Sequence, residues 1–175
     1  MTTISQEDSI RTSGLHIKVQ QHELLRALAI VSGAIGNRTT LPILGTILME
    51  ANKPDQISLT GTDLELSVKT HCAANVVLNG VAAMPGRKLY EIVRELEPGE
   101  VEIVTGKNNS LNVKTGKSFF KILGLEAADF PRFPELKKEQ SFELDEATVK
   151  ECLALTAFAT SRDETRFTLN GVLVT

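Results

Sequence analysis

The stretch Ile17-Lys-Val-Gln-Gln-His-Glu-Leu-Leu-Arg-Ala-Leu-Ala29 places an alternating strand directly before an apolar-periodic helix, and this order returns late in the chain. The second copy is Phe142-Glu-Leu-Asp-Glu-Ala-Thr-Val-Lys-Glu-Cys-Leu-Ala154, at an offset of 125 residues. With one residue of slip, the apolar strand around Gly45 matches the stretch around Gly171. A period of this length is domain-sized, whereas solenoid units are typically about 20–50 residues. The sequence therefore predicts one complete domain and the opening of a second.

The first domain is itself predicted to be a duplicated half. Residues 15–73 and residues 76–125 each read as a strand, a helix and three strands, with the helices at 21–35 and 86–96. Apolar residues fall on one stripe of each helix, which predicts one buried face. Antiparallel strands with one helix per half imply an α+β domain with both helices on one face of antiparallel sheet. The predicted strands are 15–19, 41–51, 57–59, 64–73, 76–84, 101–105, 110–114 and 118–125.

The chain divides by composition into four segments. Residues 1–14 are polar, lack the pattern of a signal peptide and are predicted to be a disordered tail. Residues 15–128 form the first domain, and 129–140, which contain two prolines, are predicted to connect the domains. Residues 141–175 supply only the start of a second domain.

Charge and cysteine content restrict the function. The net charge is −3, with 12 Lys/Arg against 10 Asp/Glu in residues 16–125 and 6 against 10 in residues 126–175. This mild charge predicts that any DNA contact is loose, because a protein that grips phosphates is usually more basic. Cys72 and Cys152 are too isolated for a disulfide framework, which favours a reducing cytoplasm. No apolar run reaches the roughly 18 residues of a membrane helix.

Two patterns imitate catalytic sites. Thr115-Gly-Lys-Ser118 resembles the end of a phosphate-binding loop, but the required earlier glycine is absent and a strand follows, which predicts a hairpin turn. Asp63, Glu65 and His71 fall on a turn and a strand without metal-ligand spacing, and Asp63 is predicted to cap the turn. No cofactor, metal site or catalytic residue is expected.

Five motifs stand in order along the chain: Leu41-Pro-Ile-Leu-Gly45, Leu59-Thr-Gly-Thr-Asp-Leu-Glu65, Pro85-Gly-Arg-Lys88, Ala127-Ala-Asp-Phe-Pro131 and Leu169-Asn-Gly171. Together they resemble the motifs of the bacterial DNA polymerase sliding clamp, the β processivity subunit. In this family each domain is a pair of β-α-β-β-β halves, three domains make a subunit, and two subunits close a ring around duplex DNA. This chain extends beyond the usual start by residues 1–14 and ends in the second domain, whereas three repeats would need about 375 residues.

The resemblance implies a DNA-facing surface. Arg87 and Arg94 are seven positions apart, within about 20° on one helical face, and spacing alone favours an ordinary solvated face. By resemblance, both join Arg26 in lining the central hole, where they attract the DNA backbone without reading bases. Loops of the two domains are implied to touch DNA near the rim, with ordinary basic loops as the alternative, through Arg38, Arg162, Arg166 and Phe167.

Two protein-binding surfaces are also implied. Leu169 and Gly171 fall where the family begins its peptide-binding pocket, with core packing as the alternative for Leu169. The last strand of the first domain is implied to pair with another subunit, since an unpaired edge strand favours association. The predicted subunit interface comprises Lys88, Ile92, Lys117, Phe120 and Ile122.

The predicted function is that of a cytoplasmic, non-enzymatic sliding-clamp subunit, here as an N-terminal fragment. It would encircle double-stranded DNA without sequence preference, as a homodimer in the full-length protein, and tether the replicative polymerase. The clamp loader is a second expected partner. Two alternatives remain open: a truncated clamp-fold interaction module that does not encircle DNA, and a small α+β enzyme using Asp63, Glu65 and His71.

Overall fold

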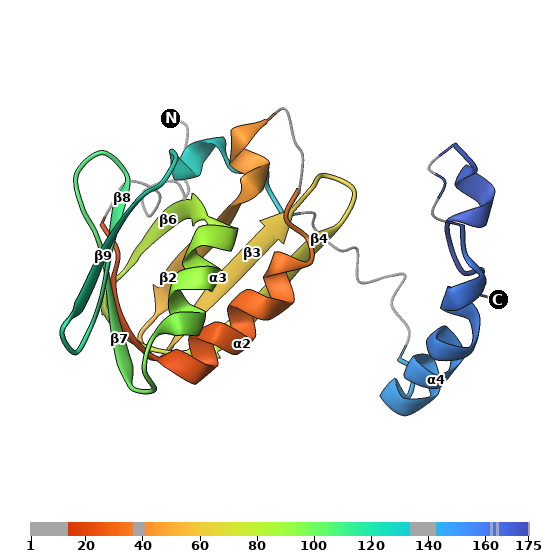
Figure 1. The fold of residues 1–175 in the computed structure, drawn as a ribbon, viewed down its shortest axis with the longest axis horizontal. Helices are drawn as coiled ribbons and strands as arrows, with labels where there is room; N and C mark the ends of the chain where they lie inside the picture. The colour runs from red at the N-terminus through yellow and green to blue at the C-terminus, as the bar shows by residue number, and fades with distance from the viewer. Residues whose placement is uncertain (1–13, 37–40, 134–142, 162, 164, 175) are drawn as a thin grey trace, which may run out of the picture. The chain divides into compact units, whose positions relative to one another are not determined.

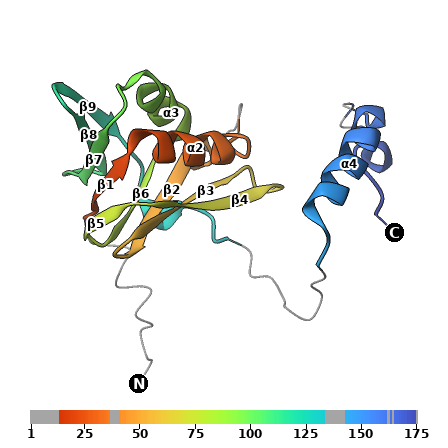
Figure 2. The same cartoon turned by 90° about the horizontal axis from the view of Figure 1, so that it is seen from below.

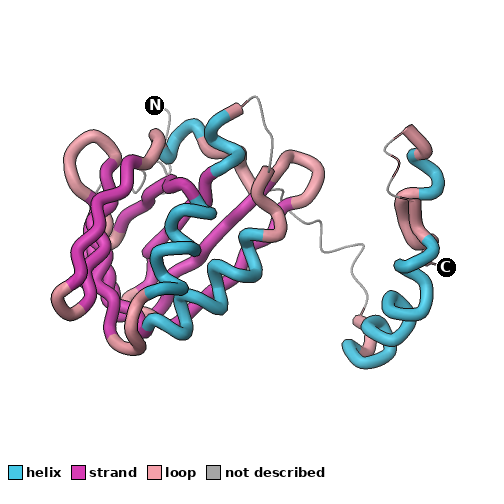
Figure 3. Tube along the Cα trace, in the orientation of Figure 1, coloured by secondary structure: helices cyan, strands magenta, loops and turns pink. Residues whose placement is uncertain are grey.

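The computed structural model describes residues 14–36, 41–133, 143–161, 163 and 165–174. Two compact units follow one another along the chain, Met1–Pro134 and Glu135–Thr175. All the strands of the described residues belong to the first unit, as the tube in Figure 3 shows.

The first unit contains two antiparallel sheets. Sheet A has five strands in the order β5-β1-β7-β8-β9, and sheet B has four in the order β4-β3-β2-β6. Their strands are β1 (His16–Gln20), β2 (Thr46–Lys53), β3 (Gln56–Thr62), β4 (Ser67–Ala73), β5 (Asn75–Leu78), β6 (Gly80–Pro85), β7 (Glu100–Thr105), β8 (Ser110–Thr115) and β9 (Ser118–Leu123).

The duplication is visible in how the two halves share the sheets. The first strand of the first half, β1, pairs with β7 of the second half, and β6 pairs with β2 of the first half. The remaining strands of each half form a meander, β2-β3-β4 or β7-β8-β9. Each half therefore gives its first strand to the sheet that the other half builds, and the predicted α+β fold of duplicated halves is confirmed.

The strand predicted at 76–84 is wrong as a single element. β5 pairs with β1 in sheet A, whereas β6 pairs with β2 in sheet B, and the chain changes sheets between Leu78 and Gly80. β5 thus closes the first half and β6 opens the second. The second half ends in the same way, with a contact to its own first strand: Leu125 forms an isolated bridge to Ala83 of β6.

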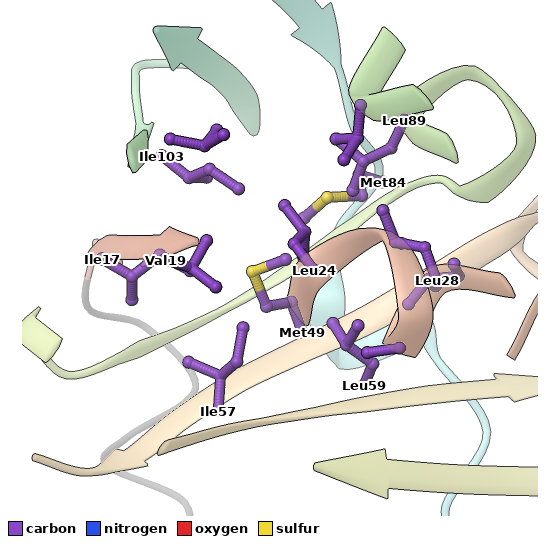
Figure 4. Packing of buried hydrophobic residues seen from close by; sticks show 14 of the residues in the cluster. Ile17, Val19, Leu24, Leu28, Met49, Ile57, Leu59, Met84, Leu89 and Ile103 are labelled. Carbon is purple, nitrogen blue, oxygen red and sulfur yellow. The ribbon is translucent and has the colours of Figure 1, made fainter. Parts of the chain in front are cut away.

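Helices α2 (Gln21–Ser32) and α3 (Gly86–Glu95) lie side by side and contact each other (Figures 1 and 2). Their buried stripes are those that the periodicity predicts, with Leu24, Leu28 and Val31 on α2 and Leu89 and Val93 on α3. These side chains meet residues of both sheets, including Ile17, Ile103, Met49 and Met84 (Figure 4).

One glycine controls how closely the helices approach the sheet. A Cβ atom on Gly86 would lie 2.4 Å from Ile35 Cδ1 and 2.7 Å from Ile47 Cγ1. Because core side chains cannot yield that much without strain, only glycine fits at the first position of α3. Gly86 therefore lets the first turn of α3 pack closely against Ile35 and Ile47, and this packing positions the exposed residues that follow it.

Several other element boundaries differ from the prediction, including those of β2, α2 and β4. Pro42–Gly45 is a 3-10 helix and β2 begins at Thr46, because Pro42 has no N–H for a sheet ladder. Helix α2 ends at Ser32, before Gly33, rather than at residue 35. β4 begins at Ser67, because the side chain of Asp63 accepts hydrogen bonds from the Glu65 and Leu66 amides and extends the turn.

The second unit consists of helical segments. Helix α4 (Glu146–Thr156) is followed by 3-10 turns at Ala157–Ala159 and Phe167–Leu169. Neither of the strands predicted to flank this helix is present in residues 143–145 or 170–174. A strand needs a neighbouring strand for its backbone hydrogen bonds, and the described part of this unit offers none.

We expect the second unit to open far more readily than the first. None of the residues of α4 is buried, and Leu153, Leu155 and Phe158 are exposed, so little apolar burial opposes unfolding. Hydrogen exchange on a dilute monomer should show fast exchange for residues 146–156 and slow exchange for β2, β3 and α2. Equal protection of α4 and α2 would contradict this expectation.

Replacing Thr60 by valine should stabilise the first unit. The Thr60 hydroxyl is buried and has no hydrogen-bond partner among the described residues, so Thr60→Val should raise the free energy of unfolding by about 1 kcal/mol. Thr62→Val is the matched control, because the Thr62 hydroxyl bonds Ser67 Oγ at 2.8 Å and the Leu64 amide at 3.0 Å. Urea denaturation should move the two midpoints in opposite directions, and a destabilised T60V variant would refute the argument.

Candidate nucleic-acid interface

The solvent face of α2 carries one arginine beside several small residues. Arg26, Ala29 and Gly33 are exposed on it, opposite the buried stripe. Ser32 adds no projecting group, because its hydroxyl turns back to donate to the Leu28 carbonyl at 2.6 Å. The larger side chain of Ile30 also projects from this side of the helix, where it is 48% exposed.

The solvent face of α3 carries charges of both signs. Arg87, Lys88 and Arg94 are exposed as predicted, but Glu91 and Glu95 are exposed as well and were missed by the sequence reasoning. Arg94 is already engaged, with its Nε 3.1 Å from Glu95 Oε1 and its guanidinium 6.0 Å from the centre of the Tyr90 ring. The attraction of this face for an anion is therefore modest.

The cations at the start of α3 do not stabilise the helix itself. Arg87 and Lys88 stand in the first turn, which holds no acidic residue. The positive end of the helix dipole disfavours cations there, by about 0.3–1 kcal/mol each. At this position Arg87 and Lys88 gain favourable electrostatic energy only by attracting a negatively charged group outside the helix.

The residues predicted to touch DNA from loops are placed differently from one another in the structure. Arg38 and Arg162 lie outside the described residues, as does the side chain of Phe167, whose backbone starts a 3-10 turn. Arg166 is exposed, with its Nε 3.5 Å from Asp163 Oδ2.

Of the predicted pocket residues, Leu169 is half exposed and its carbonyl accepts a hydrogen bond from the Ser161 amide at 2.8 Å. Gly171 is exposed beside it in sequence.

The predicted subunit interface is centred on β9, which is the end strand of sheet A. Lys117 is exposed in the turn before the strand, and Phe120 is 37% exposed. Ile122 is buried in the core, so its side chain is not available at this edge. On α3, Lys88 is exposed and Ile92 is partly buried.

Two apolar residues of β9 were missed, Phe119 and Leu123, which are 63% and 69% exposed. Strand alternation could have found them, because the core position of Ile122 places residues 119, 121 and 123 on the opposite face. The edge is therefore more apolar than predicted.

A side-chain hydrogen bond and an ion pair occupy the outer face of sheet A. His16 Nε2 lies 2.8 Å from Glu102 Oε1, and Lys18 Nζ lies 3.2 Å from Glu100 Oε1. The hydrogen bond with His16 is the main cause that lowers the pKa of the Glu102 carboxyl, and nearby cations lower it further. These groups bind one another, in contrast to the unpaired Arg26 and Arg87 in the described part of the helix face.

The patterns that imitate catalytic sites have structural roles. Thr115 pairs with Ser118 across a hairpin turn, and Asp63 caps its own turn as predicted. In the described residues no three metal-binding side chains come together. Burial, and secondarily Glu23, raises the pKa of the Cys72 thiol to about 11, so this cysteine is protonated and unreactive. The described helices include none that is long and apolar enough to cross a membrane.

Comparison with known proteins identifies the family. Residues 15–134 match the family described as DNA polymerase III beta subunit, N-terminal domain. The beta sliding clamps of Salmonella typhimurium and Escherichia coli K12 are each 37% identical to this chain over 160 residues, which is 89% of the chain. The chain spans 42% of the length of these two relatives.

Solved structures agree in fold. The Caulobacter crescentus beta sliding clamp superposes with a TM-score of 0.84 at 31% identity, over 91% of this chain and 42% of that chain. A sliding clamp from Bartonella birtlesii, bound to griselimycin, gives a TM-score of 0.85 at 30% identity over the same shares.

The expectation of a non-enzymatic protein is confirmed at the level of the family, because beta sliding clamps are non-catalytic processivity factors. The paired helices, the exchanged first strands and the match over residues 15–134 agree with one another. This chain belongs to the DNA polymerase III β-subunit family, the bacterial sliding clamps.

Proposed function

We propose that this chain supplies the first domain and the opening of the second domain of a clamp subunit that encircles duplex DNA. The observation that carries the proposal is the solvent face of α2 and α3. There Arg26 stands beside the small residues Ala29 and Gly33, and Arg87 and Arg94 are exposed on α3, on a chain of the clamp family. In this arrangement the face lines the hole of the ring, and the topology of the ring keeps the replicative polymerase on its template.

Few and exposed cations suit a clamp that slides. Each arginine attracts phosphates through solvent, where the interaction is screened by salt. Glu91 and Glu95 weaken the attraction further, and Glu95 competes with phosphate for Arg94. No paired Asn or Gln side chains stand on the face to read base edges, so binding should not depend on base sequence. The surface guides DNA without gripping it.

Other predicted residues complete the same proposal. The edge of β9, with Lys88, Ile92, Lys117, Phe120 and Ile122, pairs with a second subunit in a homodimeric ring of the full-length protein. Leu169 and Gly171 begin a pocket for peptides of the polymerase and the clamp loader. Arg38, Arg162, Arg166 and Phe167 contact DNA near the rim. The protein acts in the cytoplasm, where replication takes place.

Reversing the charge of the helix face should abolish DNA binding by this chain. If three phosphates are contacted, the wild-type slope of log K against log salt is about −2.7, measured by fluorescence anisotropy on two unrelated duplexes. The variant with Arg26→Glu, Arg87→Glu and Arg94→Glu should lose at least about tenfold in affinity, and the remaining slope should approach zero.

A matched variant controls for net charge. Lys53→Glu, Lys107→Glu and Arg132→Glu change the charge equally at exposed positions outside both helices, and should leave most of the binding. All six residues are exposed, so circular dichroism should show intact folds. Equal loss in both variants would mean that binding follows net charge and not this face. Absence of any binding by the wild-type chain would favour the alternative of an interaction module that does not encircle DNA.

A further inference from the structure

The tetrapeptide Leu-Asn-Gly-Val occurs twice in this chain, at residues 78–81 and 169–172. These are also the only two places in the sequence where an asparagine precedes a glycine. Such an asparagine can cyclise, because glycine has no side chain to hinder the attack of its own backbone nitrogen on the asparagine side chain. The two copies share the same four residues, so a difference in their reactivity has to come from the structure around them.

The first copy joins two strands, and its glycine is held in a sheet. Asn79 is exposed between β5 and β6, whereas Gly80 is buried and pairs with Ala51 of β2. The Ala83 carbonyl accepts a hydrogen bond from the Leu125 amide at 2.9 Å, so the backbone groups of Ala83 point away from β2. Because this direction alternates along a strand, the backbone groups of Gly80 point toward β2. The Gly80 nitrogen is therefore engaged in the ladder and is not free to attack.

The second copy is open to solvent. Asn170 and Gly171 are both exposed and follow the 3-10 turn Phe167–Leu169. The Gly171 amide has no hydrogen-bond acceptor among the described residues. A Cβ atom added to Gly171 would meet nothing within 4 Å, so the space around this peptide unit is free. The backbone nitrogen and the side-chain carbon that must meet are therefore both accessible.

We propose that Asn170 is a site of spontaneous deamidation in this chain and that Asn79 is protected from the same reaction. The Gly171 nitrogen attacks Cγ of Asn170, a new C–N bond closes a five-membered succinimide ring, and the bond from Cγ to the side-chain nitrogen breaks. That nitrogen leaves as ammonia, with the proton that the Gly171 amide gives up. Water then opens the ring at either of its two carbonyl groups, which yields aspartate or isoaspartate.

The reaction changes the segment proposed to begin the peptide pocket. Both products place a carboxylate between Leu169 and Gly171, and isoaspartate also lengthens the backbone by a methylene group. A carboxylate at this position disfavours an apolar peptide, because burying a charge without a partner is costly. The inference goes beyond the proposed function, because the reaction requires neither DNA nor a bound peptide.

Ageing the purified chain in mildly alkaline buffer tests the proposal. Peptide mapping by mass spectrometry measures the loss of asparagine at both positions, and labelling with isoaspartyl methyltransferase detects isoaspartate. We expect conversion at Asn170 to be at least about tenfold faster than at Asn79, because Asn79 can react only in the fraction of molecules in which the end of β6 has opened. In concentrated urea the two identical tetrapeptides should react at similar rates.

Two variants separate ring closure from simple exposure. Gly171→Val adds a branched side chain where there is open space, so it should leave Asn170 exposed and slow its loss at least about tenfold. Asn79→Gln is the matched control and should leave the rate at Asn170 unchanged. Equal rates at Asn79 and Asn170 in the native chain would overturn the proposal. So would an Asn170 that stays intact, or a difference between the two positions that persists in urea.

Discussion

The exchange of first strands between the two halves is the constraint on which this fold depends. β1 completes the sheet of the second half and β6 completes the sheet of the first, so neither half has a closed sheet of its own. Because each helix directly follows an exchanged strand, the exchange also brings α2 and α3 together. Gly86 then sets their depth, since any larger residue would collide with Ile35 and Ile47. The position of every exposed cation on the helices follows from these two features.

The helix face and the sheet edge differ in the kind of contact they support. The face combines exposed arginines with small residues and with two glutamates, which suits weak and reversible attraction to a polyanion. The edge combines exposed aromatic rings with unpaired backbone groups, which suits a specific contact with another strand. The arginines of the helix face and the aromatic residues of the sheet edge belong to different elements, whereas Lys88 and Ile92 of α3 are predicted to lie at the edge contact.

The second unit illustrates why a repeated pattern does not by itself produce a repeated structure. Its helix forms where the repeat predicts it, and Asp145 caps it by accepting from the Thr148 amide at 2.9 Å. A helix satisfies its own backbone and can form locally. Within residues 143–145 and 170–174 no flanking strand forms, and in the first unit the equivalent strands pair with partners from the other half.

The sequence alone indicated the family, through the resemblance of its motifs. It also determined the duplicated α+β domain, the buried stripes of α2 and α3 and the exposure of Arg26, Arg87 and Arg94, because helical periodicity and turn chemistry are local properties. It did not reveal that residues 76–84 belong to two sheets, because both strands have the same apolar character and differ only in their partners. It also missed that Ile122 is buried while Phe119 and Leu123 are exposed. Which face of an edge strand meets the core, and which edge stays open, depends on long-range pairing that only the tertiary structure decides.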